Sequence, residues 1–297
     1  MGEHDGEGGL PSMPGIRKVL VIAVTVSILA VGAVLAVDVG AAIRSEHRLS
    51  RSLAESPRVP FDPEVTLAGF PFLTQAGKGD YAGATIAARG VVLPGCEPAR
   101  GICRGELGAV LGRFQGPTRG DFGASDVLHT SSISAYTRLD AVTLARYLRI
   151  TDLTVSTPAP DGKVGGGGPQ DGVVSRSEGV VFTGTVALPP DDGLDADDPP
   201  SASAYTGPKV RVSVAVDLSV TEGSLEIRAT DFYTGPERHV DDAVPEDMRA
   251  AVLDRFSMVL PRLPMAWGLE AQRAESFGGD VQLVSDSGVV DVRPDRF

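Results

Sequence analysis

Hydrophobic and polar positions follow three different patterns along the chain. Residues 19–37 contain no charged residue, residues 38–56 place apolar side chains at helical spacing, and most of the chain from residue 61 onward alternates as strands do. We therefore expect a cytoplasmic tail at 1–18, a transmembrane helix at 19–37, a juxtamembrane helix and linker at 38–60, and an exported domain at 61–297.

The apolar stretch at 19–37 is long enough to cross a membrane. As a helix it would be about 28 Å long, close to the ~30 Å hydrocarbon core of a bilayer. Arg17 and Lys18 precede it and Asp38 follows, so the positive-inside rule places the N-terminus in the cytoplasm and the rest of the chain outside. A signal peptide cleaved after Ala36 is the alternative, and it also exports the remainder of the chain.

Strand patterns dominate the exported part. The clearest strand is VRVSVAVDLSV (210–220), which a TEGS turn joins to LEIRATDF (225–232) in a long antiparallel hairpin. Residues 172–188 and 281–292 predict two more hairpins, with turns at Glu178-Gly179 and Ser287-Gly288. Residues 84–93 and 127–136 predict further strands.

Helical patterns are fewer. Residues 38–56 predict a helix whose apolar stripe is Val39, Ala42, Ile43, Leu49 and Leu53, and residues 139–148 predict a short helix. Residues 245–260 predict a longer helix that begins at Pro245 and covers a sheet with the stripe Met248, Val252, Phe256, Val259 and Leu260. The segments at 165–172 and 189–203 read as loops, and the acidic one lacks the spacing of a calcium loop.

Charge and composition exclude some classes of ligand. The net charge of −12 and the pI near 4.8 disfavour nucleic acid and purely electrostatic binding to an anionic membrane. The chain is 42% hydrophobic but only 5% aromatic. Small aliphatic linings suit acyl chains, although an ordinary packed domain has the same composition.

The chain shows no motif for catalysis, metal binding or a cofactor. Its four histidines stand apart, and the acidic pair at Glu246 and Asp247 is explained by the start of a helix. We therefore expect a protein that is not an enzyme, with catalysis by carboxylates distant in sequence as the alternative.

The two cysteines predict a disulfide. Cys96 and Cys103 bound the eight residues CEPARGIC, which contain Pro98 and Gly101 and can fold back. In an oxidising compartment such a disulfide stabilises the fold by roughly 2.5 kcal/mol. Free buried thiols are the alternative, and no histidine lies nearby to complete a zinc site.

A distinctive stretch is VTLAGFPFLTQAGKGDYAGATIAARGV (65–91), in which a strand enters GFPFLTQ and another leaves after a glycine-containing turn. It resembles the LmeA-type phospholipid-binding proteins of actinobacterial cell envelopes. ITDLTVS (150–156), LPRLPMAWGLEAQRAES (260–276) and the final GGDVQLVSDSGVVDV (278–292) extend the similarity over about residues 40–293. The glycine-rich and acidic loops depart from the family pattern.

This resemblance implies both a fold and a function. The fold would be α+β, an elongated, highly curved antiparallel β-sheet wrapped around a long helix, as in tubular lipid-binding domains. The protein would bind phospholipid of the phosphatidylinositol type in the periplasm or cell envelope, and would support glycolipid assembly there with envelope biosynthesis proteins as partners. The alternative is a structural or interaction domain anchored in the envelope.

The candidate lipid-binding residues follow from these patterns. Pro71 restricts Phe70 to extended geometry, so Phe70 and Phe72 should point to one face, either of a groove or of the core. Lys78, in a stretch expected to be mobile, is a candidate partner for a headgroup phosphate. The lining should comprise Phe70, Phe72, Leu73, Val212, Val214, Val216, Leu218, Val252, Phe256 and Leu260.

Overall fold

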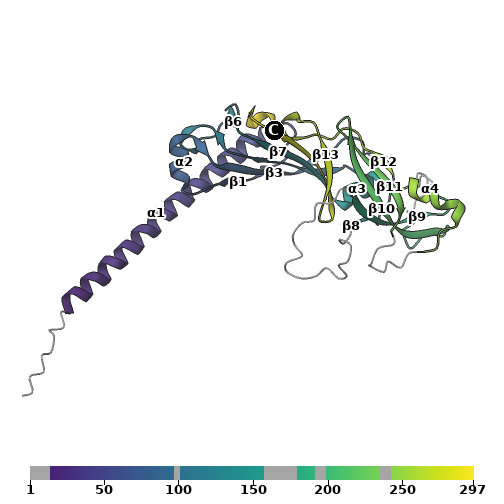
Figure 1. Ribbon diagram of the computed structural model, residues 1–297, viewed down its shortest axis with the longest axis horizontal. Coiled ribbons are helices and arrows are strands. Elements are labelled where there is room, and N and C mark those ends of the chain that lie inside the picture. The colour runs from purple at the N-terminus through teal and green to yellow at the C-terminus, as the bar shows by residue number, and fades with distance from the viewer. Residues whose placement is uncertain (1–13, 97–100, 157–178, 191–198, 234–241) are drawn as a thin grey trace, which may run out of the picture.

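The computed structural model describes residues 14–96, 101–156, 179–190, 199–233 and 242–297 (Figure 1). Most of the predicted cytoplasmic tail, the glycine-rich loop, the first arm of the predicted 172–188 hairpin and most of the acidic loop lie outside these residues.

The helix α1 (Pro14–Ala54) is unbroken, so the predicted juxtamembrane helix is the continuation of the apolar helix. Residues 19–37 are exposed, and among the described residues α1 is the one helix long and apolar enough to cross a membrane. Length and composition do not separate such a helix from a signal sequence. Figure 1 shows its N-terminal half extending away from the rest of the molecule.

The C-terminal half of α1 packs on the domain. Leu49 and Leu53 are fully buried, but Val39 and Ile43, predicted on the same stripe, are exposed. Two buried serines of α1, and Ser56 just after its end, connect this half to segments far apart in sequence. Their hydroxyls donate to backbone carbonyls at 2.6–2.8 Å, Ser50 to Pro63, Ser52 to Phe122 and Ser56 to Phe297.

The strands form three antiparallel sheets. The six-stranded sheet has the order β1 (Glu64–Ala68), β3 (Gly83–Val92), β4 (Arg104–Leu111), β7 (Ile133–Leu139), β14 (Asp280–Ser287), β13 (Arg273–Phe277). The five-stranded sheet has the order β12 (Met258–Val259), β11 (Ser224–Phe232), β10 (Lys209–Thr221), β9 (Gly179–Ala187), β8 (Thr154–Ser156). The four-stranded sheet has the order β15 (Val290–Val292), β6 (Leu128–Thr130), β5 (Phe114–Gln115), β2 (Asp80–Tyr81).

Short helices complete the described structure: α2 (Phe72–Lys78), α3 (Ala141–Leu148), α4 (Arg249–Asp254) and the 3₁₀ turns η2 (Thr118–Gly120), η3 (Glu246–Met248), η4 (Ala266–Gly268) and η5 (Pro294–Arg296). The six-stranded sheet lies between α1 and the five-stranded sheet in an elongated molecule (Figure 1). The α+β class with antiparallel sheets and a long apolar helix is thus confirmed. The tubular arrangement is not confirmed: the strands divide among three sheets, and none closes around a long helix.

The β10–β11 hairpin matches its prediction. Thr221 pairs with Ser224, and the two turn residues Glu222 and Gly223 have φ of 51° and 76°. Two residues with positive φ give a turn whose twist fits the flanking strands. The strand predicted at 84–93 is β3, and the short helix predicted at 139–148 is α3.

The prediction of a hairpin at 281–292 is wrong. β14 pairs with β7 and β13, whereas β15 turns away and pairs with β6 in the four-stranded sheet. The strand predicted at 127–136 is likewise divided between β6 and β7. Alternation identifies a strand and its faces, but it does not identify the partner strand.

The helix predicted at 245–260 is also wrong in extent. α4 ends at Asp254, and β12 then pairs with β11. The Phe256 amide donates to the carbonyl of Leu253 at 3.0 Å, in a turn that ends the helix. Further along the chain, the Leu260 amide donates to the carbonyl of Leu225 at 2.8 Å. Pairing with β11 therefore replaces the last turns of the helix.

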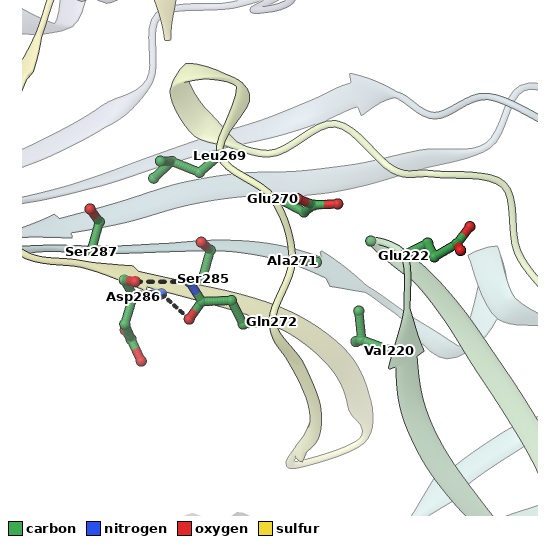
Figure 2. A pocket seen from close by; sticks show the side chains of 10 residues that line it. Val220, Glu222, Leu269, Glu270, Ala271, Gln272, Ser285, Asp286 and Ser287 are labelled. Carbon is green, nitrogen blue, oxygen red and sulfur yellow. Dashed lines mark hydrogen bonds between the residues drawn. The ribbon is translucent and has the colours of Figure 1, made fainter.

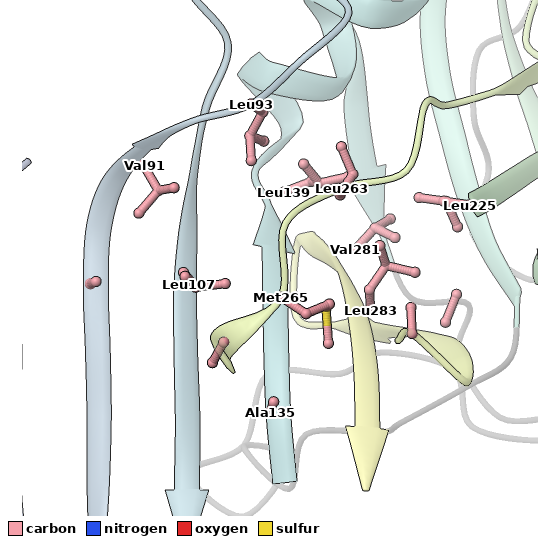
Figure 3. Packing of buried hydrophobic residues seen from close by; sticks show 14 of the residues in the cluster. Val91, Leu93, Leu107, Ala135, Leu139, Leu225, Leu263, Met265, Val281 and Leu283 are labelled. Atoms are coloured by element: carbon pink, nitrogen blue, oxygen red, sulfur yellow. The ribbon is translucent and has the colours of Figure 1, made fainter. Parts of the chain in front are cut away.

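The core joins the sheets through an extended segment that follows β12. Figure 3 shows this segment crossing the six-stranded sheet, with Leu263 and Met265 directed at Leu139 and Leu283 on the strands below. The Thr137 hydroxyl donates to the carbonyl of Pro264 and fixes the crossing. One cluster of buried apolar residues thus reaches from the six-stranded sheet to Leu225 of β11.

Candidate functional site

One face of the five-stranded sheet is apolar along its whole length. The predicted residues Val212, Val214, Val216 and Leu218 of β10 are all buried on it. Register pairing adds neighbours on both sides: Val180 and Phe182 from β9, and Ile227 and Leu225 from β11. We call this surface the β10 face.

The segment after α4 covers the β10 face. Val252, Phe256 and Leu260 are buried, although only Val252 belongs to the helix. Gly184, which pairs with Val212, lies next to the Phe256 ring: a Cβ atom there would stand 3.6 Å from Phe256 Cε1, at ordinary van der Waals distance. The structure therefore brings seven predicted lining residues together, four on the sheet and three on its cover.

Three hollows among the described residues are relevant to ligand binding: two adjoin the five-stranded sheet or its cover, and one lies on the six-stranded sheet. The first has a volume of about 400 Å³ and separates the β10–β11 turn from the end of β14 (Figure 2). Val220, the next apolar position of β10, lines it, but so do Glu222, Glu270 and Asp286. Three carboxylates make it unfavourable for an anionic phosphate.

The second hollow, of about 200 Å³, lies beside β12 at the end of the cover. Met258 and Val259 give it an apolar side, and Arg146 and Arg149 also line it. Arg146 Nη1 donates to the carbonyl of Ile102 at 2.7 Å, which directs its guanidinium. We call it the arginine hollow.

The wall of the arginine hollow is fixed by buried polar contacts. The Tyr147 hydroxyl donates to the carbonyl of Pro94 at 2.6 Å, and burial raises the pKa of Tyr147 to about 12, so it remains a neutral donor. A disulfide joins Cys96 to the buried Cys103, with 5.8 Å between their Cα atoms. The predicted disulfide is therefore present.

The third hollow, of about 240 Å³, is a charge network on the six-stranded sheet. Arg89 Nε and Arg138 Nη1 lie 3.1 and 3.2 Å from the carboxylate of Glu106, and Asp140 and Asp280 line the same space. Burial raises the pKa of Asp280 although Arg138 opposes the shift. Because Arg89 and Arg138 already face the carboxylate of Glu106, this network ties strands together.

The GFPF stretch lies elsewhere and has another geometry. Phe70 is 66% exposed and Phe72 only 4%, so they do not share a face. The reason is that α2 begins at Phe72, whose amide donates to Asp38 of α1. The stretch expected to be mobile has a defined structure instead. Most of it belongs to α2, and it ends at the buried Tyr81, whose ring stacks on that of Phe114 with 4.9 Å between the ring centroids.

Leu73 is exposed on α2, and so is Lys78 at its C-terminal end. α2 packs against α1 and η2, at the end of the domain opposite the five-stranded sheet (Figure 1). The structure thus divides the predicted lipid contacts into two groups, one at α2 and one on the β10 face.

The described residues hold no group of three or more histidine, cysteine or acidic side chains placed to bind a metal ion. His129, which stands alone in sequence, pairs with Asp291 at 2.7 Å across β6 and β15, and both side chains are exposed. His239 lies outside the described residues.

Comparison with known families shows to which family this apolar domain belongs. A family model described as LmeA-like phospholipid-binding matches residues 36–285, which is most of the chain. The chain belongs to the LmeA-like phospholipid-binding family. No curated protein and no solved structure matches it. The LmeA-like match begins within the apolar stretch of α1 and ends in β14, so it includes both groups of candidate residues.

Membership of the LmeA-like family supports lipid binding, and the structure adds residues that sequence reasoning missed. Arg146 lies in the last turn of α3 and Arg149 follows it in a left-handed conformation, positions that a helix C-terminus explains without a ligand. Asp38 reads in the sequence only as the charge that ends the apolar stretch. No sequence signal connects these residues to a site, because their partners come from distant segments.

Proposed function

We propose that the protein is an extracytoplasmic phospholipid-binding protein, anchored in the cell membrane by residues 19–37, that supports lipid or glycolipid assembly in the cell envelope. The observation that carries the proposal is the LmeA-like family match, which starts where an exposed apolar helix leads into the domain. The resemblance of the GFPFL stretch makes phosphatidylinositol-type lipids the expected ligands and envelope biosynthesis proteins the expected partners.

The β10 face is the proposed site for an acyl chain. A bilayer stabilises a chain by about 0.8 kcal/mol per methylene, so a 16-carbon chain gains roughly 13 kcal/mol there. A binding protein must offer comparable apolar surface, and the β10 face with its cover is a continuous surface of this kind in the described structure. In this proposal the chain enters by displacing the segment that carries Phe256.

The cover is short, and it is held at the edge of the sheet by the β12–β11 pairing and by polar contacts of Arg255 and Ser257. α4 has six residues, and below it Arg255 donates to the carbonyl of Leu148 at 2.6 Å. The Ser257 hydroxyl accepts from the Ala229 amide at 3.0 Å. Breaking these contacts exposes Val252, Phe256 and Leu260 together.

The arginine hollow is the proposed headgroup site. Arginine forms paired hydrogen bonds with phosphate oxygens, and Arg146 and Arg149 lie where the cover ends. A volume of about 200 Å³ suits a headgroup rather than acyl chains. Lys78 remains a second candidate for a headgroup contact, at the α2 end of the molecule.

Native mass spectrometry tests the proposal on a chain that begins at Ala36. Residues 19–35 are exposed in the structure, so this chain keeps the packing contacts described above, including those of Asp38. After incubation with phosphatidylinositol-containing liposomes and repurification, we expect a protein mass increased by one or more phospholipids. A repeatedly clean protein mass would contradict lipid binding and favour a structural domain, and a converted lipid would indicate an enzyme.

A pair of variants locates the headgroup. Arg146→Gln should weaken lipid retention because it removes a cation from the arginine hollow. Arg89→Gln is the control, since Arg89 is exposed and belongs to the charge network on the six-stranded sheet. Equal retention by both variants would move the headgroup away from Arg146.

A further inference from the structure

The turn before α2 displays two apolar side chains outward. Phe70 is 66% exposed and Leu73 is 45% exposed. The turn is held firmly, because Gly69 has φ of 94° and a Cβ atom there would stand 2.7 Å from Gln75 Nε2 and 2.8 Å from Ala82 Cβ. Gln75 Oε1 in turn accepts the Ala82 amide at 2.8 Å. The exposure of Phe70 is therefore built into the fold.

Asp38 fastens this turn to α1. It is buried, and its two carboxylate oxygens accept the amides of Phe72 at 2.9 Å and Leu73 at 2.8 Å. Asp38 is also the first charged residue after the apolar stretch at 19–37. Phe70 and Leu73 are thus held beside the part of α1 where the apolar stretch long enough to cross a membrane ends.

The chain between α1 and α2 runs back along α1, as three hydrogen bonds show. The carbonyl of Pro63 accepts from Ser50, the amide of Leu67 donates to Glu46, and the amide of Phe72, the first residue of α2, donates to Asp38. Asp38 and Ser50 are about 18 Å apart along the helix axis. Phe61, just before Pro63, therefore lies far from Asp38 although it is as exposed as Phe70, at 68%.

We propose that Phe70 and Leu73 insert into the outer interface of the phospholipid bilayer that α1 crosses, and so hold the domain against the membrane surface. Val37 and Val39, which flank Asp38 on α1, are exposed as well. An aromatic ring and aliphatic side chains beside the end of a spanning helix match the composition of an interfacial anchor. The inference rests on the membrane anchoring in the proposed function, but not on the β10 face or the arginine hollow.

Site-specific fluorescence on the full chain in vesicles tests this. The natural cysteines form a disulfide, so single cysteines introduced by Phe70→Cys, Leu73→Cys or Phe61→Cys carry an environment-sensitive nitrobenzoxadiazole label alone. In phosphatidylcholine–phosphatidylglycerol vesicles, the labels at 70 and 73 should be quenched by doxyl-labelled phospholipid and protected from aqueous iodide. The label at 61 should show the reverse.

The remaining outcomes overturn the inference in distinguishable ways. Equal iodide quenching at 70 and 61 would show that the turn stays in water. Protection from iodide without doxyl quenching would show that protein, such as a second copy of this chain, covers the turn. Protein that fails to float with the vesicles would remove both the anchor and the docking. Failure to bind lipid in the mass-spectrometric experiment would leave the fluorescence result standing, because docking needs no bound lipid.

Discussion

Ile150 packs against Gly184, and the absence of a side chain at Gly184 makes this contact possible. A Cβ atom at Gly184 would stand 3.6 Å from Phe256 Cε1 but only 2.5 Å from Ile150 Cγ2. The cover and the segment after α3 therefore meet the sheet at one point. Both partners are buried, so neither has space into which it can move.

Gly184→Ala should consequently destabilise the domain. Forcing a methyl group into a filled core costs about 1–3 kcal/mol. Chemical denaturation of the chain from Ala36 measures this as a lower free energy of unfolding. Gly77→Ala in α2 is the matched control, because nothing lies within 4 Å of a Cβ there, and a helical alanine should stabilise by up to about 1 kcal/mol. Equal effects of the two substitutions would show that Ile150 can move aside to make room at Gly184.

Loss of the disulfide should also lower stability. Replacing Cys96 and Cys103 together by alanine removes a link across a short loop, which costs about 2.5 kcal/mol through the entropy of the unfolded chain. Denaturation with and without a reducing agent checks it: the reductant should destabilise the natural chain and leave the double variant unchanged. A reductant effect on the double variant would point to a cause other than this bond.

Much of the strand structure could be predicted because its determinants are local. The β10–β11 hairpin follows from strict alternation and a two-residue turn that contains Gly223. The apolar set on β10 follows from the same alternation, since side chains two positions apart share a face. The partner of β15 could not be predicted in this way, because it is selected by packing at Leu128 in a distant segment.

The errors in the candidate site have the same origin in long-range contacts. α2 begins at Phe72 because Asp38, 34 residues earlier, accepts its amide, and this separates Phe70 from Phe72. The predicted helix at 245–260 ends early because residues 258–259 pair with β11 as strand β12. Phe256 and Leu260 nevertheless reach the β10 face, since an apolar side chain is buried in either conformation.

Removal of the Asp38 carboxylate should loosen the turn at α2. Asp38→Ala leaves two buried amides without their acceptor, which costs about 1–3 kcal/mol. Asp38→Asn keeps one acceptor oxygen and should lose less. Denaturation of both variants of the chain from Ala36 gives the comparison, and equal losses would indicate that the charge rather than the capping geometry stabilises the turn.

Two aspartates should contribute to the pH dependence of the domain's stability with opposite signs. Burial raises the pKa of Asp280 in the folded protein, so its contribution to stability is complete below about pH 4 and is lost as the pH rises through the folded-state pKa. Asp280→Asn should therefore raise the melting temperature at pH 7 and change it little at pH 3.

Asp80 provides the control of opposite sign. Its hydrogen bonds to Arg113 lower its pKa, so its contribution is present above the ordinary aspartate pKa and is lost as the pH falls. Asp80→Asn should lower the melting temperature at pH 7 and lose this effect in acid. Melting curves of both variants at the two pH values check the signs, and a shift of the same sign at pH 7 would contradict the assignment.

Phe256→Ala separates a lipid site from an ordinary core position. With the cover in place on the β10 face, this substitution leaves a cavity and should lower the free energy of unfolding by about 3–5 kcal/mol. Phe114→Ala is the matched control, since Phe114 is equally buried but packs on Tyr81 in the four-stranded sheet. If an acyl chain takes the place of the Phe256 ring, phospholipid should raise the melting temperature of the Phe256 variant more than that of the Phe114 variant, because a ligand stabilises the state that binds it. Equal shifts in the two variants would remove Phe256 from the acyl site and leave it as part of the core.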